Sequence, residues 1–126
     1  MCVGCVSLTL CSRQAPEVML CQNYGLSADI YSLGILLWNI LALEAPYGKI
    51  TSTKLFEHVV ERKKRPRKLN GIPKSVQRLM EQCWSAKPSE RPSSKEMVST
   101  LQAEVRTELD PSQGGDRSIL SVYNHG

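Results

Sequence analysis

The sequence predicts a mainly α-helical chain whose longest helix is apolar on nearly every side. Apolar residues recur at helical spacing, Pro and Gly interrupt the chain between those segments, and no segment gives a convincing strand pattern. The composition, with 41% hydrophobic and 22% charged residues, is typical of a folded chain. With 126 residues, the chain is long enough for one small domain.

The first helical turn is expected from Ala15 to Leu20. Pro16 would occupy a first-turn position, where its missing N–H group costs nothing. Before this turn, residues 1–13 show no clear period and are expected to be irregular.

One long helix is expected from Ser27 to Glu44. Ser27 and Asp29 stand at its start, where acceptor oxygens and negative charge suit the free N–H groups. Apolar residues occupy all sides of this segment, which is typical of a central helix covered by other elements. Because few other segments remain to cover it, the sequence suggests that part of the surrounding structure is missing.

Three more helices are expected after a turn at residues 45–48. Thr51 to Arg62 and Lys74 to Trp84 both carry apolar residues at helical spacing. A capping-box pattern at residues 93–96 starts the last helix, which runs to about Thr107. The residues expected to face inward are Leu55, Phe56, Val59, Val60, Val76, Leu79, Met80, Cys83, Met97, Leu101 and Val105.

Basic residues are concentrated in the segment 62–68, and the chain has a net charge of +4. A run of this kind is most often a solvated loop. A nuclear-import or nucleic-acid patch is a second interpretation, and a docking surface for an acidic protein is a third. Nucleic acid is disfavoured because no aromatic residue interleaves with the run to stack on bases.

Cysteine usage favours reduced thiols over a disulfide framework or a zinc site. The number of cysteines is odd, and Cys2 and Cys5 form a lone CxxC pair, whereas zinc requires a second pair of ligands. The apolar segment from Ile30 to Leu43 is too short to span a bilayer. We expect no metal, no membrane span and a cytoplasmic location, with nuclear entry through residues 62–68 as an alternative.

Four motifs follow one another along the chain: APE at residues 15–17, SADIYSLGILLW at 27–38, APY at 45–47 and CWSAKPSERPS at 83–93. Their order and spacing resemble the large lobe of eukaryotic protein kinases, most closely the tyrosine-kinase-like serine/threonine group, with true tyrosine kinases next. The resemblance implies the C-terminal part of that lobe in the two-lobed kinase fold: a short APE turn, a buried central helix and three more helices.

The resemblance also implies an ion pair between Glu17 and Arg91. From the residues alone, two exposed charges without contact are the default, because charged residues are mostly exposed. A buried carboxylate would need a partner, and an arginine can offer two parallel hydrogen bonds. In the family, the glutamate of the APE motif pairs with the arginine that Arg91 matches.

Three further residues have roles that the resemblance implies. Asp29 matches the aspartate that anchors the catalytic loop in the family, although a simple charge at a helix N-terminus is the alternative. Gly34 would allow a close approach within the central helix, at a propensity cost of about 1 kcal/mol. Trp84 is expected to pack between the last two helices.

The groups that perform phosphoryl transfer in kinases do not occur in this sequence. Kinases use a Gly-rich loop, a strand lysine, an HRD catalytic loop and a DFG segment, with ATP and Mg²⁺ as cofactors. None of these segments is found here. We therefore expect no catalytic, cofactor-binding or metal-binding residue and an inactive chain, whereas the intact family domain would transfer phosphate from ATP to Ser/Thr or Tyr of proteins.

The segment before Ala15 departs from the family pattern. Kinases carry Gly-Thr, two residues, then Tyr or Trp just before APE, and this segment contacts the substrate; here residues 9–14 read TLCSRQ. The expected division is a non-kinase-like segment 1–12, a partial kinase domain 13–107 and a flexible tail 108–126. The chain would be either a truncated product or an incomplete reading of a longer gene.

A non-enzymatic interaction module derived from a kinase lobe is the alternative function. A lobe without its neighbouring surface exposes apolar area, which binds partners or aggregates. The expected docking surface is the helix Thr51 to Arg62 with the basic segment after it. In either case the partners are expected to be proteins, and the under-covered central helix predicts a marginally stable chain.

Overall fold

The computed structural model describes residues 11–110, and its helices follow the predicted order. No strand occurs among the described residues, so the prediction of a mainly α fragment with a central helix is confirmed. The elements are α2 (Pro16–Met19), α3 (Leu26–Ala42), α4 (Ser52–Phe56), the π-helical turn η1 (Glu57–Glu61), α5 (Lys74–Cys83), the 3₁₀ turn η2 (Pro88–Glu90) and α6 (Ser94–Leu109).

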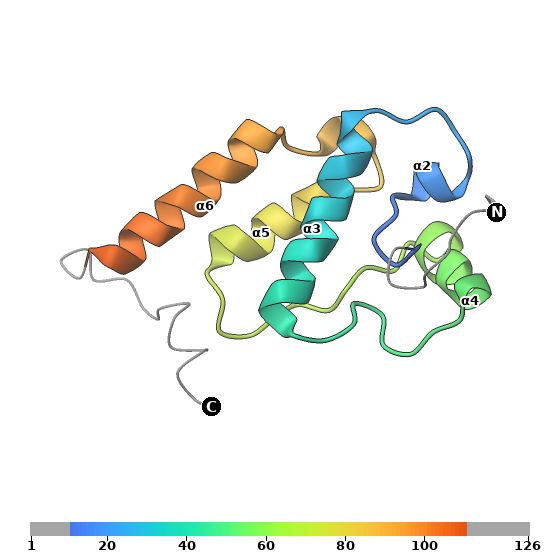
Figure 1. The fold of residues 1–126 in the computed structure, drawn as a ribbon, viewed down its shortest axis with the longest axis horizontal. Helices are drawn as coiled ribbons and strands as arrows, with labels where there is room; N and C mark the ends of the chain where they lie inside the picture. Colours follow the sequence, from blue (N-terminus) through green and yellow to red (C-terminus); the bar gives the residue numbers. More distant parts are fainter. Residues whose placement is uncertain (1–10, 111–126) are drawn as a thin grey trace.

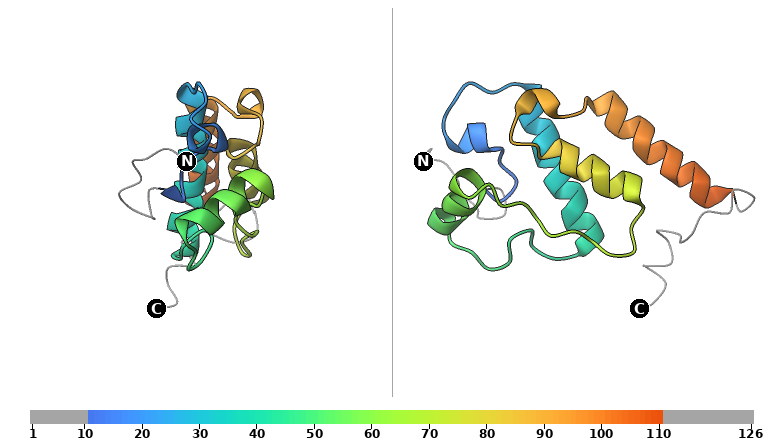
Figure 2. Two further views of the ribbon diagram at one scale, coloured as in Figure 1. Left: turned by 90° about the vertical axis from the view of Figure 1, so that its right-hand side faces the viewer. Right: turned by 180° about the vertical axis from the view of Figure 1, so that it is seen from behind.

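Helix α3 lies at the centre of the arrangement (Figure 1). Helix α5 packs against α3, and α6 packs against the other side of α5. Helix α2 contacts η1, and both lie away from α6 across α3, as the view from behind also shows (Figure 2). Within residues 11–110, no helix is both long enough and apolar enough to cross a membrane.

The start of α3 differs from the prediction. Its N-cap is Gly25, and no side chain caps the first turn, so the expectation that Ser27 serves there as an acceptor is wrong. Asp29 does lie in the first turn. The helix ends at Ala42, and its C-cap Leu43 adopts a left-handed conformation with φ of 55°. Glycine usually occupies such a position, because a side chain there is sterically disfavoured.

One face of α3 is buried against the rest of the chain. Tyr31, Ile35 and Trp38 are fully buried in a cluster that also contains Met80 of α5 and Trp84. The closest approach of the two helices is at Gly34, since a Cβ atom added there would lie 2.5 Å from the Cβ of Cys83. Such a distance is far below normal contact, so this packing requires a residue without a side chain.

The opposite face of α3 is open. Leu33 and Ile40 are 43% and 51% exposed, and Leu26 and Leu43 at the ends of the helix are still more exposed. These residues, here called the open face of α3, are too large and too close together to be typical isolated surface residues. The central helix is therefore buried on one side only.

The segment predicted as one helix from Thr51 to Arg62 has two parts. Thr51 caps α4 by accepting a hydrogen bond from the Lys54 N–H at 3.4 Å, and the chain then continues as the π-helical turn η1. Leu55 and Val59 are buried as expected, in a cluster with Cys11 and Met19. Residues 51–62 contain no Pro or Gly that would have indicated the change of helix type.

Helices α5 and α6 follow the predicted pattern except at one position. The capping box at the start of α6 is confirmed: the Ser93 hydroxyl accepts from the Glu96 N–H, and the Glu96 carboxylate accepts from the Ser93 N–H at 2.6 Å. Met97 is buried against α5. The prediction that Val105 faces inward is wrong, because it is 54% exposed where the longer α6 extends beyond α5.

Two of the thiol predictions are also corrected. Cys11 and Cys21 each form a disulfide bond, so the expectation of reduced thiols is wrong for them. Cys83 is a free, buried thiol. The CxxC pair Cys2 and Cys5 lies outside the described residues.

Candidate functional site

The structure brings Glu17 and Arg91 together across 74 residues of sequence. Arg91 Nη1 donates to Glu17 Oε1 at 2.6 Å, and Nη2 donates to Oε2 at 3.0 Å, so the contact is bidentate. Both residues are buried, each with about 8% of its surface exposed. Each buried charge is therefore paired, and the two parallel hydrogen bonds are the bidentate arrangement that makes carboxylate–guanidinium contacts strong.

Arg91 also binds two backbone carbonyls and an aromatic ring. Its Nε donates to Ser85 O at 3.0 Å, and Nη1 donates to Ser27 O at 2.9 Å. The guanidinium carbon lies 5.0 Å from the centre of the Tyr31 ring, within the range of a cation–π contact. Through these hydrogen bonds Arg91 connects α2, the start of α3 and the segment after α5.

The electrostatics keep Glu17 ionised. Burial acts to raise the pKa of the Glu17 carboxyl group, but the hydrogen bond from Arg91, with smaller contributions from backbone and charge, lowers it more. The net pKa lies below the usual value. A buried carboxylate that stays charged depends on its partner, so removing Arg91 should be more damaging than removing a surface cation.

A second arginine approaches Tyr31 from the basic segment. The guanidinium carbon of Arg65 lies 5.3 Å from the ring centre, while its Nε donates to Trp84 O at 2.9 Å and its Nη1 to Val59 O at 3.1 Å. Tyr31 is thus contacted by two guanidinium groups. Burial raises the pKa of its hydroxyl group, although the Arg65 charge acts in the opposite direction, so the ring stays neutral.

The basic segment 62–68 is therefore not simply a solvated run. Trp38 Nε1 donates to Arg67 O at 2.8 Å, and the Arg67 guanidinium lies 5.8 Å from the Trp38 ring centre and pairs with Glu44. Two further ion pairs are Arg62 with Glu57 at 2.6 Å and Lys68 with Glu81 at 3.7 Å. Several of its charges are already paired within the chain, which leaves less of the segment for an acidic partner than the sequence suggested.

The side chain of Asp29 is exposed and makes no hydrogen bond to another described residue. It lines an open groove of about 570 Å³ between α3 and the start of α6, together with Leu26, Leu33 and Arg91. Trp84, in contrast, is buried in the central cluster beside Tyr31 and accepts the Arg65 hydrogen bond through its carbonyl. The structure thus places Trp84 in the core, Glu17 and Arg91 beside it, and Asp29 at the surface.

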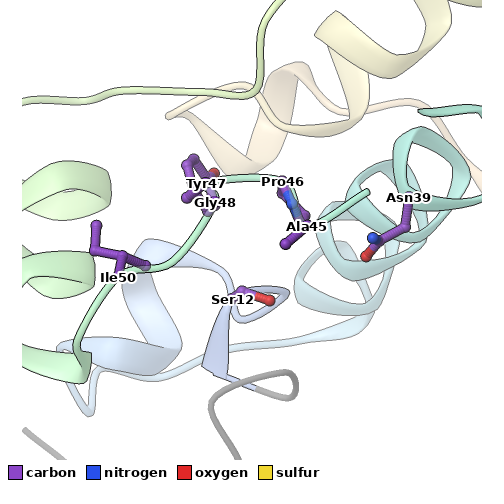
Figure 3. A pocket seen from close by; sticks show the side chains of 7 residues that line it. All are labelled: Ser12, Asn39, Ala45, Pro46, Tyr47, Gly48 and Ile50. Carbon is purple, nitrogen blue, oxygen red and sulfur yellow. The ribbon is translucent and has the colours of Figure 1, made fainter. Parts of the chain in front are cut away.

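A small pocket lies between the segment before α2 and the loop after α3. Figure 3 shows the Ser12 hydroxyl and the Asn39 amide pointing toward the space between them. Ala45, Pro46, Tyr47, Gly48 and Ile50 complete the wall of this cavity of about 110 Å³. Neither Ser12 nor Asn39 was selected from the sequence, since only the fold brings these segments together.

No candidate metal site is found in the part of the chain that the structure describes. Among residues 11–110, no group of three or more His, Cys, Asp or Glu side chains could hold a metal ion. Magnesium in kinase-type sites is held by carboxylate and amide oxygens beside the phosphates.

Comparison with known proteins agrees with the motifs. The family model described as protein tyrosine and serine/threonine kinase matches residues 9–101. The chain is 41% identical over 88 residues to the dual specificity protein kinase shkC of Dictyostelium discoideum, a match that covers 69% of this chain and 17% of that protein. It is 35% identical over 88 residues to human mitogen-activated protein kinase kinase kinase 7, covering 69% and 14%.

The chain therefore spans less than a fifth of the length of these relatives. The family match includes the APE turn, α3 and α5 and ends within α6. The chain belongs to the protein tyrosine and serine/threonine kinase family.

Proposed function

We propose that this chain forms the structural base of a protein kinase domain and is inactive by itself. In a longer protein, sequence outside this chain would provide the ATP site and the catalytic loop, and the intact domain would transfer phosphate from ATP to Ser/Thr or Tyr residues. The buried pair of Glu17 with Arg91 is the observation that carries this proposal. It joins the APE turn to the segment after α5 and so fixes the helices in the arrangement that such a domain needs.

The open face of α3 supports the same proposal. Asp29, Leu33 and Ile40 lie along one side of the helix, and all three are exposed to solvent. A central helix of this hydrophobicity is normally covered on all sides. The role proposed for Asp29 is to anchor a loop that packs on this face, as the corresponding aspartate does in the family.

Nucleotide binding tests the proposal directly. The purified 126-residue chain should show no saturable, Mg²⁺-dependent binding of ATP by calorimetry. A longer natural protein containing this segment should bind ATP and phosphorylate a protein substrate. Binding by the short chain would contradict the proposal, and failure of the longer protein to transfer phosphate would contradict the assigned activity.

A non-enzymatic interaction module is the second candidate, and the open face of α3 is the observation that favours it. The helix Thr51 to Arg62, which the sequence indicated as the docking surface, is less suitable because Leu55 and Val59 are buried. An endogenous protein of 14.1 kDa, detected with an antibody against residues 110–126, would favour this candidate. A much larger band would favour the kinase proposal.

A further inference from the structure

The exposed side of α3 carries a regular pattern of side chains at alternating intervals of three and four residues. The positions, here called the α3 seam, are Leu26, Asp29, Leu33, Leu36, Ile40 and Leu43. All except Asp29 are apolar, and all except the half-buried Leu36 are exposed. This spacing is that of the a and d positions through which two helices pack in a coiled coil. The seam runs from the first residue of α3 to its C-cap.

The other side of α3 is the one that packs within the chain. Helix α5 crosses behind α3 in Figure 1 and in front of it in the view from behind (Figure 2). The contact with α5 is made through Gly34, which lies on the side opposite the seam. At its N-terminal end the seam continues into the groove of about 570 Å³ that Leu26 and Leu33 share with residues 91–94. This groove leaves room beside Leu26 for a side chain of a second molecule.

The seam is complementary to itself when two copies of α3 run in opposite directions. Each a position of one helix then faces a d position of the other, and the two-fold axis repeats every contact. Leu33 faces Leu36 of the second copy. Leu26 faces Leu43 of the second copy, whose side chain would enter the groove. Apolar residues therefore meet apolar residues over most of the length of the helix.

The same register gives the one charged residue of the seam a partner. Asp29 faces Ile40 of the second copy and lies next to Asn39 of that copy. In each chain Arg13 Nε donates to Asn39 Oδ1 at 3.4 Å, so the guanidinium group lies at the rim of the seam. A guanidinium group has five N–H donors, which leaves several that can bind a carboxylate. A parallel arrangement would instead place Asp29 opposite Asp29 of the second copy, where the like charges repel.

We propose that the 126-residue chain forms a symmetric antiparallel dimer through the α3 seam, with Asp29 of each copy bound to Arg13 of the other. The dimer covers the side of the central helix that the single chain leaves exposed. The proposal does not rest on kinase activity. In a longer protein, a loop packed on this face would exclude the second copy, so the dimer belongs to the short chain.

Sedimentation equilibrium of the purified chain between about 1 and 500 µM tests for the dimer, because a modest interface gives an affinity within this range. We expect the mean mass to rise with concentration from 14.1 kDa to twice that value and no further. A closed two-fold interface uses the same surface of both copies and leaves none for a third.

Two variants locate the interface. Leu33→Asp places a charge in the centre of the seam and should leave the chain monomeric over the whole concentration range. Val98→Asp is the matched control, because Val98 is 52% exposed and Leu33 43% exposed, but Val98 lies on α6. The control should dimerise like the natural chain. Both variants should keep the circular dichroism spectrum of the natural chain, since neither residue is buried.

Charge exchange tests the register. Asp29→Arg and Arg13→Glu should each raise the Kd of the dimer by about 10-fold or more, because both copies of the ion pair become repulsive. The double variant should recover most of the affinity. Asp29→Asn distinguishes the two orientations: it should weaken an antiparallel dimer, whereas it would strengthen a parallel one by removing two facing carboxylates.

Three results would overturn the proposal. They are a folded chain that stays monomeric at about 500 µM, equal effects of Leu33→Asp and Val98→Asp on association, and tighter association in Asp29→Asn. None of them bears on the proposed function, which is tested by nucleotide binding and by the activity of a longer protein. ATP binding by the short chain would contradict that function and leave the dimer unaffected.

Discussion

The substitution Gly34→Ala tests the packing of α3 against α5. A Cβ atom at this position would lie 2.5 Å from the Cβ of Cys83, 3.6 Å from the Met80 carbonyl oxygen and 3.7 Å from the Cys83 Cα. The first distance cannot be relieved by rotating a side chain, because a Cβ atom moves only with its backbone. The two helices would have to separate locally.

Two opposing free energies determine the result. Replacing Gly by Ala inside a helix is favourable by about 1 kcal/mol. Overpacking a well-packed core costs about 1–3 kcal/mol, and the upper part of this range applies when backbone must move. We therefore expect a net destabilisation of about 1–2 kcal/mol, which is opposite in sign to the effect of Gly→Ala at an unobstructed helix position.

Urea unfolding followed by tryptophan fluorescence measures this difference, since Trp38 and Trp84 are both buried. An osmolyte such as trimethylamine N-oxide would keep the folded baseline measurable in a chain of low stability. With a slope of about 1–1.5 kcal/mol per molar urea, the midpoint should fall by about 1 M. Gly25→Ala, at the N-cap of α3, is a control for the added methyl group alone, because no atom lies within 4 Å of its Cβ.

The double variant Gly34→Ala with Cys83→Gly identifies the clash. If Cys83 Cβ is the obstacle, the two substitutions should be coupled and the double variant more stable than the sum of the single effects predicts. An unchanged or raised midpoint in Gly34→Ala would refute the close approach of α3 and α5.

Three other predictions follow from the same contacts. Arg91→Ala should destabilise the fold by about 3–5 kcal/mol because it leaves Glu17 buried without a partner. Lys87→Ala, in the exposed pair with Glu90, should have little effect on stability. Equal urea midpoints for the two variants would contradict this. The pKa of Glu17 in the folded chain is below its usual value of 4.5. The stabilisation by the pair should therefore be complete above pH 4.5 and should decline as the pH falls through the folded pKa. A pH series of melting temperatures should show this decline in the natural chain and not in Arg91→Ala. Burial raises the pKa of the Cys83 thiol from 9.0 to about 11. The contribution of the buried thiol to stability should therefore be complete below pH 9 and be lost as the pH rises toward 11. Cys83 should be labelled slowly by a thiol reagent at about pH 8, and rapid labelling of the folded chain would argue against its burial.

The helices could be predicted from the sequence because their signals are local. Periodicity identified the buried residues of α5, and the Ser93 to Glu96 pattern identified the start of α6. Val105 has the same spacing signal as Met97, yet it is exposed because α6 is longer than its neighbour α5. Periodicity shows which side of a helix is apolar, but it does not show where the neighbouring helix ends.

The contacts of the arginines were less predictable. A run of basic residues indicates solvent exposure, and nothing in the sequence marks Arg65 as the member that contacts Tyr31 and the Trp84 carbonyl. The pair of Glu17 with Arg91 was expected only from the family resemblance, because its members are 74 residues apart. The contact of Arg13 with Asn39 had no sequence signal, because it depends on how the segment before α2 crosses α3.

The buried charged and aromatic residues of this chain contact one another. Glu17 binds Arg91, Arg91 contacts Tyr31, and Arg65 connects Tyr31 to Trp84, all on the buried side of α3. These contacts all lie within the chain and join its helices and turns to one another. Loss of Arg91 should then disturb the fold of the short chain and the activity of a longer protein together, whereas loss of Asp29 should affect only the latter.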